Sequence, residues 1–165
     1  KMELQAQISL AKSMGLKPSH IDSHEGALFF DPNIFKIYID LAIENDLLAF
    51  VPIEASMHFN GELDKPNNAV IIDQFHMLHG GTEVEDIENF YFNVIRNLKP
   101  GLSQIIIHLG KDEPELKKIT VDHPNFDYRW RQKDNDIMNS KEFKNLLKEN
   151  DIKLISWLDL KKAIL

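Results

Sequence analysis

The sequence predicts an α/β fold in which parallel strands form an open sheet or a partial (β/α) barrel. Short apolar segments alternate with helical ones, an order typical of parallel strands that helices cover on both faces. Five predicted strands in 165 residues are too few to close a barrel, which needs about 200 residues or more. The chain contains no internal repeat and no linker, so we expect a single domain over residues 1–165.

The first half of the chain predicts two helices and three strands. Apolar residues near a helical period, followed by Gly15, predict a helix over residues 2–15. Asp31 as N-cap and Pro32 at the first helical position predict the start of a second helix. Strands are predicted over residues 16–22, 47–53 and 69–73, with a polar, turn-rich loop over residues 57–68.

The second half of the chain predicts three more helices and two more strands. The predicted elements are a helix over residues 84–98, a strand over 102–108, an irregular segment with one turn of helix over 112–136, a helix over 140–150, a strand over 152–156 and a helix over 157–165. Pro100 and Gly101 end the first of these helices, and Ser140 is the expected N-cap of the second.

The composition excludes several classes of partner. There are 19 Lys and Arg against 26 Asp and Glu, a net charge of −7 without a basic stripe, so neither nucleic acid nor an anionic membrane surface is expected. No apolar run reaches the roughly 20 residues of a membrane span. Without cysteine, a metal would have to be held by His, Asp or Glu. The chain begins with Lys1, as a processed or cut chain would, so the lack of a visible signal peptide assigns no compartment.

Polar residues gather where the predicted strands end, which is where parallel α/β folds place their ligand chemistry. His20, Asp22 and His24 alternate along the first strand, so their side chains are predicted to face one side. His24 is a candidate metal ligand that Asp22 could orient; the alternative is a loop histidine that caps a turn. His20 lies deeper in the strand, where a histidine packed in the core is the better interpretation.

A second candidate is His108, which follows three isoleucines and precedes Gly110. This pattern predicts that its imidazole emerges at the rim of the sheet. Asp73 has a similar place after the third strand, although no histidine accompanies it two residues away. A single histidine after a strand is usually structural or solvated, but three polar strand ends together favour a functional site.

The other histidines are weaker candidates. The spacing of His76 and His79 is compatible with a metal, but the glycines that follow indicate a solvated loop. His58 and His123 stand alone in the sequence and are expected at the surface.

The segment "RWRQKDND" carries Arg131 and Asp134 in a charge run, which is usually a solvated face. Trp130 within it could stack on a sugar, although packing in a core is the commoner fate of a tryptophan. The motifs of serine hydrolases, nucleotide-binding proteins and zincins are all missing from the sequence.

Taken together, these segments resemble the YdjC/ChbG-like carbohydrate deacetylase family. The segment "KPSHIDSH" is similar to that family's "pTHxDSH" motif, and "IIIHLG" is similar to its later HPG motif. The closing pattern "R..D…S.E…L….I.LISW.DL" also resembles the family's C-terminal end, so the resemblance covers Met2 to about Ile164. It implies a deformed (β/α) barrel whose N-terminal strands are missing from this chain, which would be the C-terminal three-fifths of a family member.

The resemblance further implies a metal-dependent hydrolase that removes N-acetyl groups from small acetylated amino sugars. A divalent metal, Mg or Zn, would polarise the acetamide carbonyl and activate water, a carboxylate would act as base, and a histidine would protonate the leaving amine. By position, His24 matches the metal-binding histidine and His108 matches the general acid. The residues expected to support these two or to line the pocket are Asp22, His20, Asp73 and Arg131.

The chain departs from the family pattern at several points. It holds no counterpart of the family's N-terminal aspartate pair, which supplies the base and a metal contact, or of a second metal histidine, so we expect this chain alone to be inactive. Gly26 stands where the family motif continues with histidine, and Leu109 replaces the proline of the HPG motif. The competing hypothesis is a noncatalytic α/β binding or interaction module, in which exposed strand edges favour assembly into a homo-oligomer.

Overall fold

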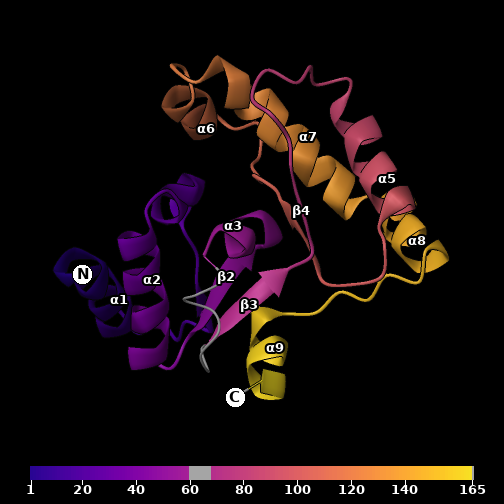
Figure 1. Cartoon of the computed structure of the whole chain (residues 1–165). Coiled ribbons are helices and arrows are strands. Elements are labelled where there is room, and N and C mark those ends of the chain that lie inside the picture. Colours follow the sequence, from indigo (N-terminus) through magenta and orange to yellow (C-terminus); the bar gives the residue numbers. More distant parts are fainter. Residues whose placement is uncertain (60–67, 165) are drawn as a thin grey trace. The chain divides into compact units, whose positions relative to one another are not determined.

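The computed structural model describes residues 1–59 and 68–164. These residues form two compact units: one comprises the residues up to Asp73 together with those from Ile155 onward, and the other runs from Gln74 to Leu154. Figure 1 shows the helices and strands of both units. The predicted fold class is confirmed, because the paired strands of each unit are parallel and both sheets are open.

The first unit is built on a parallel sheet, which has the strand order β1-β2-β3 among the described residues. Its elements are α1 (Met2–Ser13), β1 (His20–Ile21), the 3-10 helix η1 (His24–Phe29), α2 (Pro32–Glu44), β2 (Leu48–Pro52), α3 (Ile53–His58), β3 (Ala69–Ile72) and α9 (Trp157–Ile164). Ala49 of β2 lies opposite Ala69 of β3, and Pro52 lies opposite Ile72, so these two strands end side by side.

Helix α2 begins where the sequence predicts. Asp31 accepts hydrogen bonds from the amides of Asn33 and Ile34, at 2.8 and 3.1 Å, and Pro32 occupies the first turn. The helix packs on β2, the central strand, all of which is buried. One hydrophobic cluster in the core of this unit is formed by Phe35, Tyr38, Ile39, Ala42, Ala49, Val51 and Ala55.

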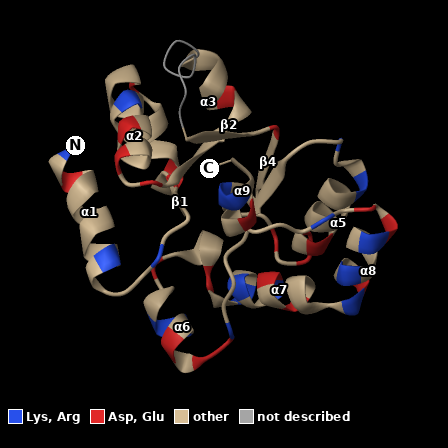
Figure 2. Cartoon of the chain, turned by 90° about the horizontal axis from the view of Figure 1, so that it is seen from below, with Lys and Arg blue, Asp and Glu red and all other residues tan. Residues whose placement is uncertain are grey.

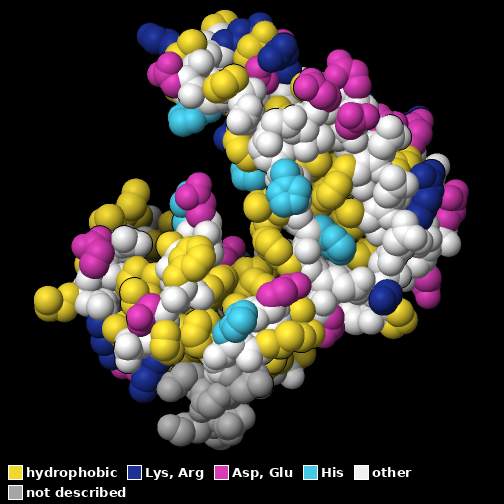
Figure 3. Space-filling view, turned by 45° about the horizontal axis from the view of Figure 1, so that its top comes forward, with side chains coloured by type: hydrophobic (Ala, Val, Ile, Leu, Met, Phe, Trp, Pro, Cys, Tyr) yellow, Lys and Arg dark blue, Asp and Glu magenta, His cyan; other side chains and the backbone are white. Residues whose placement is uncertain are grey.

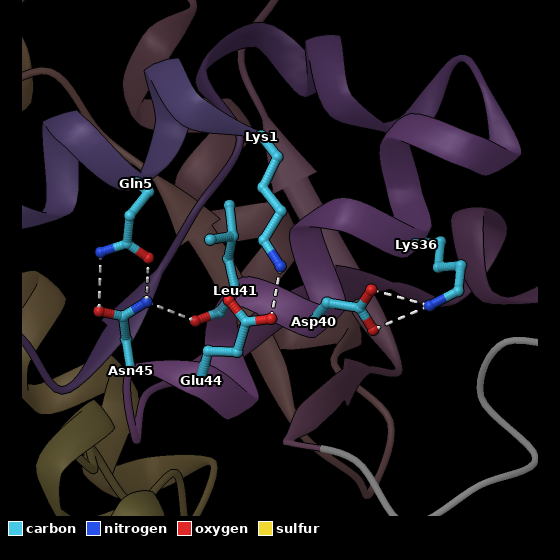
Figure 4. A network of polar contacts seen from close by, with 7 residues as sticks. All are labelled: Lys1, Gln5, Lys36, Asp40, Leu41, Glu44 and Asn45. Carbon is cyan, nitrogen blue, oxygen red and sulfur yellow. Dashed lines mark hydrogen bonds and ion pairs between the residues drawn. The ribbon is translucent and has the colours of Figure 1, made fainter.

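Polar contacts join helix α1 to α2, and all residues of α1 are exposed or half-buried. The side-chain amides of Gln5 and Asn45 exchange two hydrogen bonds, of 3.2 and 2.8 Å, and Asn45 also donates to the carbonyl of Leu41 (Figure 4). Lys1 forms an ion pair with Glu44 in the same network. Polar contacts at or near the surface stabilise a fold only slightly, so we expect these contacts to add little to the stability of the unit.

The second unit combines two parallel strands with a group of helices. Its elements are β4 (Gln74–Met77), α5 (Ile87–Asn97), β5 (Ser103–Ile106), α6 (Pro114–Ile119), the 3-10 helix η2 (Pro124–Phe126), α7 (Tyr128–Asn139) and α8 (Lys141–Glu149). Helices α5, α7 and α8 pack against one another (Figure 1). The core between them consists of Leu78, Ile87, Tyr91, Ile95, Trp130, Ile137, Phe143, Leu146 and Leu147, with Ile105 and Ile107 packed against it.

Residues 112–136 are much more helical than predicted, because they contain α6 and most of α7. Asp127 is the N-cap of α7 and accepts hydrogen bonds from the amides of Arg129 and Trp130. Trp130 and Ile137 share a buried face of the helix. The many charged residues between them hide the helical period, so the prediction of an irregular segment is wrong.

The strand predicted over residues 152–156 is not formed, whereas His76, predicted to lie in a solvated loop, belongs to β4. Strand β4 pairs with β5, and the Gln74 side chain makes two hydrogen bonds with the backbone of Lys99, at 2.8 and 2.9 Å. Leu154, by contrast, is 77% exposed and has no strand beside it in the described part of the chain. An apolar segment becomes a strand only where a neighbouring strand is available.

The start of α8 agrees with the sequence prediction, and the predicted loop over residues 57–68 agrees only in part. Ser140 caps α8 as predicted, since its Oγ accepts a hydrogen bond from the amide of Phe143 at 3.0 Å. Of the loop predicted over residues 57–68, Met57 and His58 belong to α3, while residues 60–67 lie outside the described residues.

Charges of both signs lie on the same helices, as α6 and α8 show in Figure 2. Within residues 1–59 and 68–164, no helix has the length and apolar character needed to cross a bilayer.

Candidate functional site

Strand β1 is shorter than the sequence predicts. It ends at Ile21, and His24 is already the first residue of η1. The prediction that His20, Asp22 and His24 alternate along one strand is therefore wrong. Asp22 instead lies at the carboxyl end of β1, in the link to the helix that His24 begins.

A tight turn holds this link in place. Ser23 is the N-cap of η1, and its buried Oγ accepts a hydrogen bond from the amide of Leu28 at 2.8 Å. Glu25 and Gly26 both adopt positive φ angles, of 53° and 69°, and glycine reaches such angles at little cost. Gly26 thus suits the backbone of this turn.

Asp22 and His24 are brought close enough to interact electrostatically. The surroundings of the Asp22 carboxylate exclude part of the water, which raises its pKa, while the Ser23 amide and the charge of His24 lower it. The Ser23 amide donates to Asp22 Oδ1 at 2.6 Å. His24 itself is exposed, so its imidazole is accessible to a ligand.

Tyr38 fixes the strand end that carries Asp22. Its hydroxyl lies 2.8 Å from the carbonyl oxygen of Ile21 and 2.9 Å from that of Phe50, and it shares its proton between them. Burial, followed by the nearby charge of Asp22, raises the pKa of Tyr38. The hydroxyl therefore stays protonated and ties β1 to β2.

His20 packs as a structural residue. Its ring stacks on Trp157 of α9, with ring centroids 4.2 Å apart and planes at 7°. Burial lowers the pKa of His20, which favours the neutral imidazole. The stacking supports the interpretation of His20 as a packed histidine that holds α9 against the sheet.

The residues described do not by themselves form a metal site. Within residues 1–59 and 68–164, no three His, Asp or Glu side chains gather closely enough to hold a metal ion. Catalytic zinc generally takes three protein ligands, and His24 supplies one imidazole. The donor set around His24 and Asp22 is therefore too small on its own.

A pocket of about 530 Å³ opens in the first unit, beside the end of β2. Three aromatic side chains dominate its lining, which consists of Phe29, Phe30, Pro52, Glu54, Ala55, His58 and Phe59. Phe30 is 84% exposed, so its ring is available to a ligand. Asp73, the predicted pocket residue after β3, is exposed and is not among these lining residues.

His108 lies just beyond the carboxyl end of β5, as predicted, in the second unit. Its backbone amide donates a hydrogen bond to Asp134 Oδ2 at 2.8 Å. Its imidazole packs beside two aromatic rings, those of Phe126 at 5.9 Å and Trp130 at 5.7 Å between centroids. His108 is thus fixed in two ways: Asp134 holds its backbone, and the rings of Phe126 and Trp130 pack beside its half-buried imidazole.

Arg131 and Gly110 connect the turn that follows His108 to helix α7. The Gly110 amide donates to the carbonyl of Arg131 at 3.1 Å, and Arg131 Nε donates to the carbonyl of Phe126 at 3.1 Å. A Cβ at position 110 would approach Leu116 Cδ2 to 2.7 Å and Arg131 Cβ to 3.0 Å, so a larger residue there would force the Leu116 side chain to move and would crowd Arg131. The turn after His108 is therefore anchored to α7.

The remaining candidates have mixed outcomes. His58 and His123 are exposed, as expected, and His79 is exposed after β4. Trp130 is buried at 2% exposure and packs in the core, the commoner fate of a tryptophan. On the face drawn in Figure 3, histidine side chains reach the surface among hydrophobic ones.

The prediction missed the role of Asp134, which is fully buried and does not lie on a solvated face. One signal was available: Trp130, Asp134 and Ile137 recur at the spacing of a buried helical face. The partner Tyr91, which donates to Asp134 Oδ1 at 2.8 Å, lies on α5 and has no sequence signal that connects the two.

Comparisons with known proteins locate the chain in a family. No curated protein sequence matches it. A crystal structure from Enterococcus faecalis V583, of a protein provisionally named a cellobiose-phosphate cleavage protein, matches 93% of the chain with a TM-score of 0.69 and 21% identity. The chain spans 56% of that protein's length, and the likeness concerns the fold. The model of the YdjC-like protein family matches residues 1–149, so the chain belongs to the YdjC-like family.

Proposed function

We propose that this protein is a metal-dependent hydrolase that removes N-acetyl groups from small acetylated amino sugars. The observation that carries the proposal is the placement of His108, which follows β5 in a YdjC-like chain and is held by a buried carboxylate. Parallel α/β folds place their catalytic groups at this end of the strands.

His108 is proposed as the general acid that protonates the leaving amine. Its imidazole is half-buried beside Phe126 and Trp130, which limits its rotation and keeps part of the bulk water away. A histidine can donate a proton near neutral pH, and a fixed position lets it reach the same atom in each cycle.

His24 is proposed as one ligand of a divalent metal, Mg or Zn, with Asp22 as a supporting carboxylate. Its exposure and its electrostatic contact with Asp22 support this role. The further ligands and the carboxylate base are proposed to come from outside the described residues, because those residues supply too few donors.

The aromatic pocket of the first unit is proposed to bind the saccharide. Pockets that bind small molecules combine apolar and aromatic walls with a few polar groups, and here Glu54 and His58 supply the polar groups. The name of the similar protein from Enterococcus faecalis refers to a phosphorylated disaccharide, a substrate of the size proposed here.

The test is acetate release by the full product of the gene that encodes this chain, with an N-acetylated disaccharide of glucosamine as substrate. We expect chelation to abolish release and added Mg²⁺ or Zn²⁺ to restore it. Elemental analysis should show that His24→Ala loses bound metal whereas His123→Ala, an exposed histidine, retains it. Absence of acetate release at any metal loading would contradict the proposed activity.

The second candidate function is a noncatalytic binding or interaction module. Its support is that each unit exposes an apolar strand residue: Ile71 of β3 is 42% exposed in the first unit, and Met77 of β4 is 43% exposed in the second. Exposed strand edges favour pairing with a second copy. Light scattering that shows a homo-oligomer, together with full metal loading and no acetate release, would favour this alternative.

A further inference from the structure

Asp134 is the most deeply buried acidic residue among those described. It lies on α7, has 0% exposure, and shares the buried face of the helix with Trp130 and Ile137. A carboxylate in such surroundings is costly unless hydrogen-bond donors meet its oxygens. Each carboxylate oxygen of Asp134 therefore needs a hydrogen-bond donor within the core.

Both oxygens of Asp134 accept hydrogen bonds, and from different elements. Oδ1 accepts from the hydroxyl of Tyr91 on α5, and Oδ2 accepts from the backbone amide of His108, each at 2.8 Å. Burial raises the pKa of Asp134, while these two bonds and the charges of His108 and Arg131 lower it. Two accepting oxygens match the pattern of an ionised carboxylate.

The bond to His108 acts just where the chain leaves β5. The strand ends at Ile106, so the ladder with β4 no longer holds the backbone at His108. The carboxylate of Asp134 replaces that ladder partner from the side of α7. Trp130, one helical turn earlier on α7, packs against the His108 ring. Helix α7 thus holds the backbone of His108 through Asp134 and packs against its imidazole through Trp130.

We propose that Asp134 is the positioning residue of His108, holding the end of β5 so that the imidazole is presented in one place for proton transfer. This inference rests on the proposed function, in which His108 is the general acid. Tyr91 has the supporting task of orienting the carboxylate through its second oxygen. The competing account is that Asp134 only stabilises the core of the second unit.

Amide hydrogen exchange separates the two accounts without depending on activity. The variants are Asp134→Leu, similar in shape but unable to accept the His108 amide, and Ile137→Ala, which damages the same buried face without touching that bond. We expect Asp134→Leu to speed exchange of the His108 amide about 10-fold more than that of the Ile105 and Ile106 amides. In Ile137→Ala all three should change together.

Asp134→Asn supplies a second variant in case the leucine variant fails to fold. An asparagine oxygen can still accept from the His108 amide while its NH₂ group donates to the Tyr91 oxygen. We therefore expect protection of the His108 amide to be largely kept. Exchange at His108 that follows Ile105 and Ile106 in Asp134→Leu, or unprotected exchange at His108 in the asparagine variant, would overturn the proposal.

Steady-state kinetics test whether the positioning of His108 by Asp134 affects acetate release. In the full gene product, Asp134→Leu should lower kcat for acetate release about 10-fold or more with little change in KM, and Asp134→Asn should restore most of it. Ile137→Ala should keep its kcat at temperatures where it is folded. An unchanged kcat in Asp134→Leu contradicts the positioning role, whereas wild-type protein without activity contradicts the proposed function and leaves the exchange experiment to decide on Asp134.

Discussion

At the scale of single residues, the stack between His20 and Trp157 connects two parts of the chain that are far apart in sequence. The two rings are nearly parallel and 4.2 Å apart, and Phe50 meets the same tryptophan edge-on at 6.3 Å. The stack therefore couples the protonation of one imidazole to the packing of α9 on β1.

This coupling predicts how stability depends on pH. Burial lowers the pKa of His20 in the folded protein, so below the unfolded value of about 6.5 the unfolded chain binds more protons. The free energy of unfolding should therefore fall as the pH drops below that value. In His20→Phe, which keeps an aromatic ring and removes the titration, the fall should be shallower. The measurement is urea unfolding at a series of pH values between about pH 5 and about pH 8.

His76 provides the internal comparison for this prediction. Burial lowers its pKa as well, so it contributes a slope of the same sign that remains in the His20→Phe variant. Identical slopes in wild type and variant would show that His20 does not titrate differently in the folded protein.

At the scale of elements, the helix starts could be predicted because capping is local. Asp31 and Ser140 each accept a hydrogen bond from an amide two or three residues later, and both were recognisable from sequence alone. The strand over residues 152–156 could not be judged in this way, because a strand depends on a partner that local sequence does not reveal.

The cap of α2 gives a quantitative prediction with a matched control. Asp31→Ala removes two hydrogen bonds to the first turn and should lower the free energy of unfolding by about 1 kcal/mol. Asp86 occupies the N-cap of α5 but makes no side-chain capping bond, so Asp86→Ala should change stability much less. Chemical denaturation of both variants measures the difference; equal losses would mean that the Asp31 bonds contribute nothing net.

At the scale of the whole molecule, the predicted α/β class and parallel strands follow from periodicity, whereas the division into two units does not. Each unit has its own hydrophobic core, and the chain passes between them at Asp73 and again at Leu154. The boundary at Asp73 separates β3 from β4 by one residue, so neither a glycine nor a change of composition marks it.

In the candidate site, too, local sequence identifies some residues and misses those that depend on distant contacts. His24 and His108 could be singled out because each belongs to a short motif near the end of a strand. Asp134 was missed because its hydrogen bond with the His108 amide joins residues 26 positions apart in the sequence, and its charged neighbours suggest a solvated face. Motifs therefore identify the groups proposed for chemistry, while the structure identifies what holds one of them in place.

The most direct test of this account is the rate of acetate release by the full gene product in which His108 is replaced by glutamine. Loss of a general acid should lower the rate about 100-fold or more at equal metal content. His79→Gln, an exposed histidine of the same unit, should keep the wild-type rate. If His108→Gln releases acetate as fast as His79→Gln, His108 is not the acid, and the catalytic site must lie elsewhere in the protein.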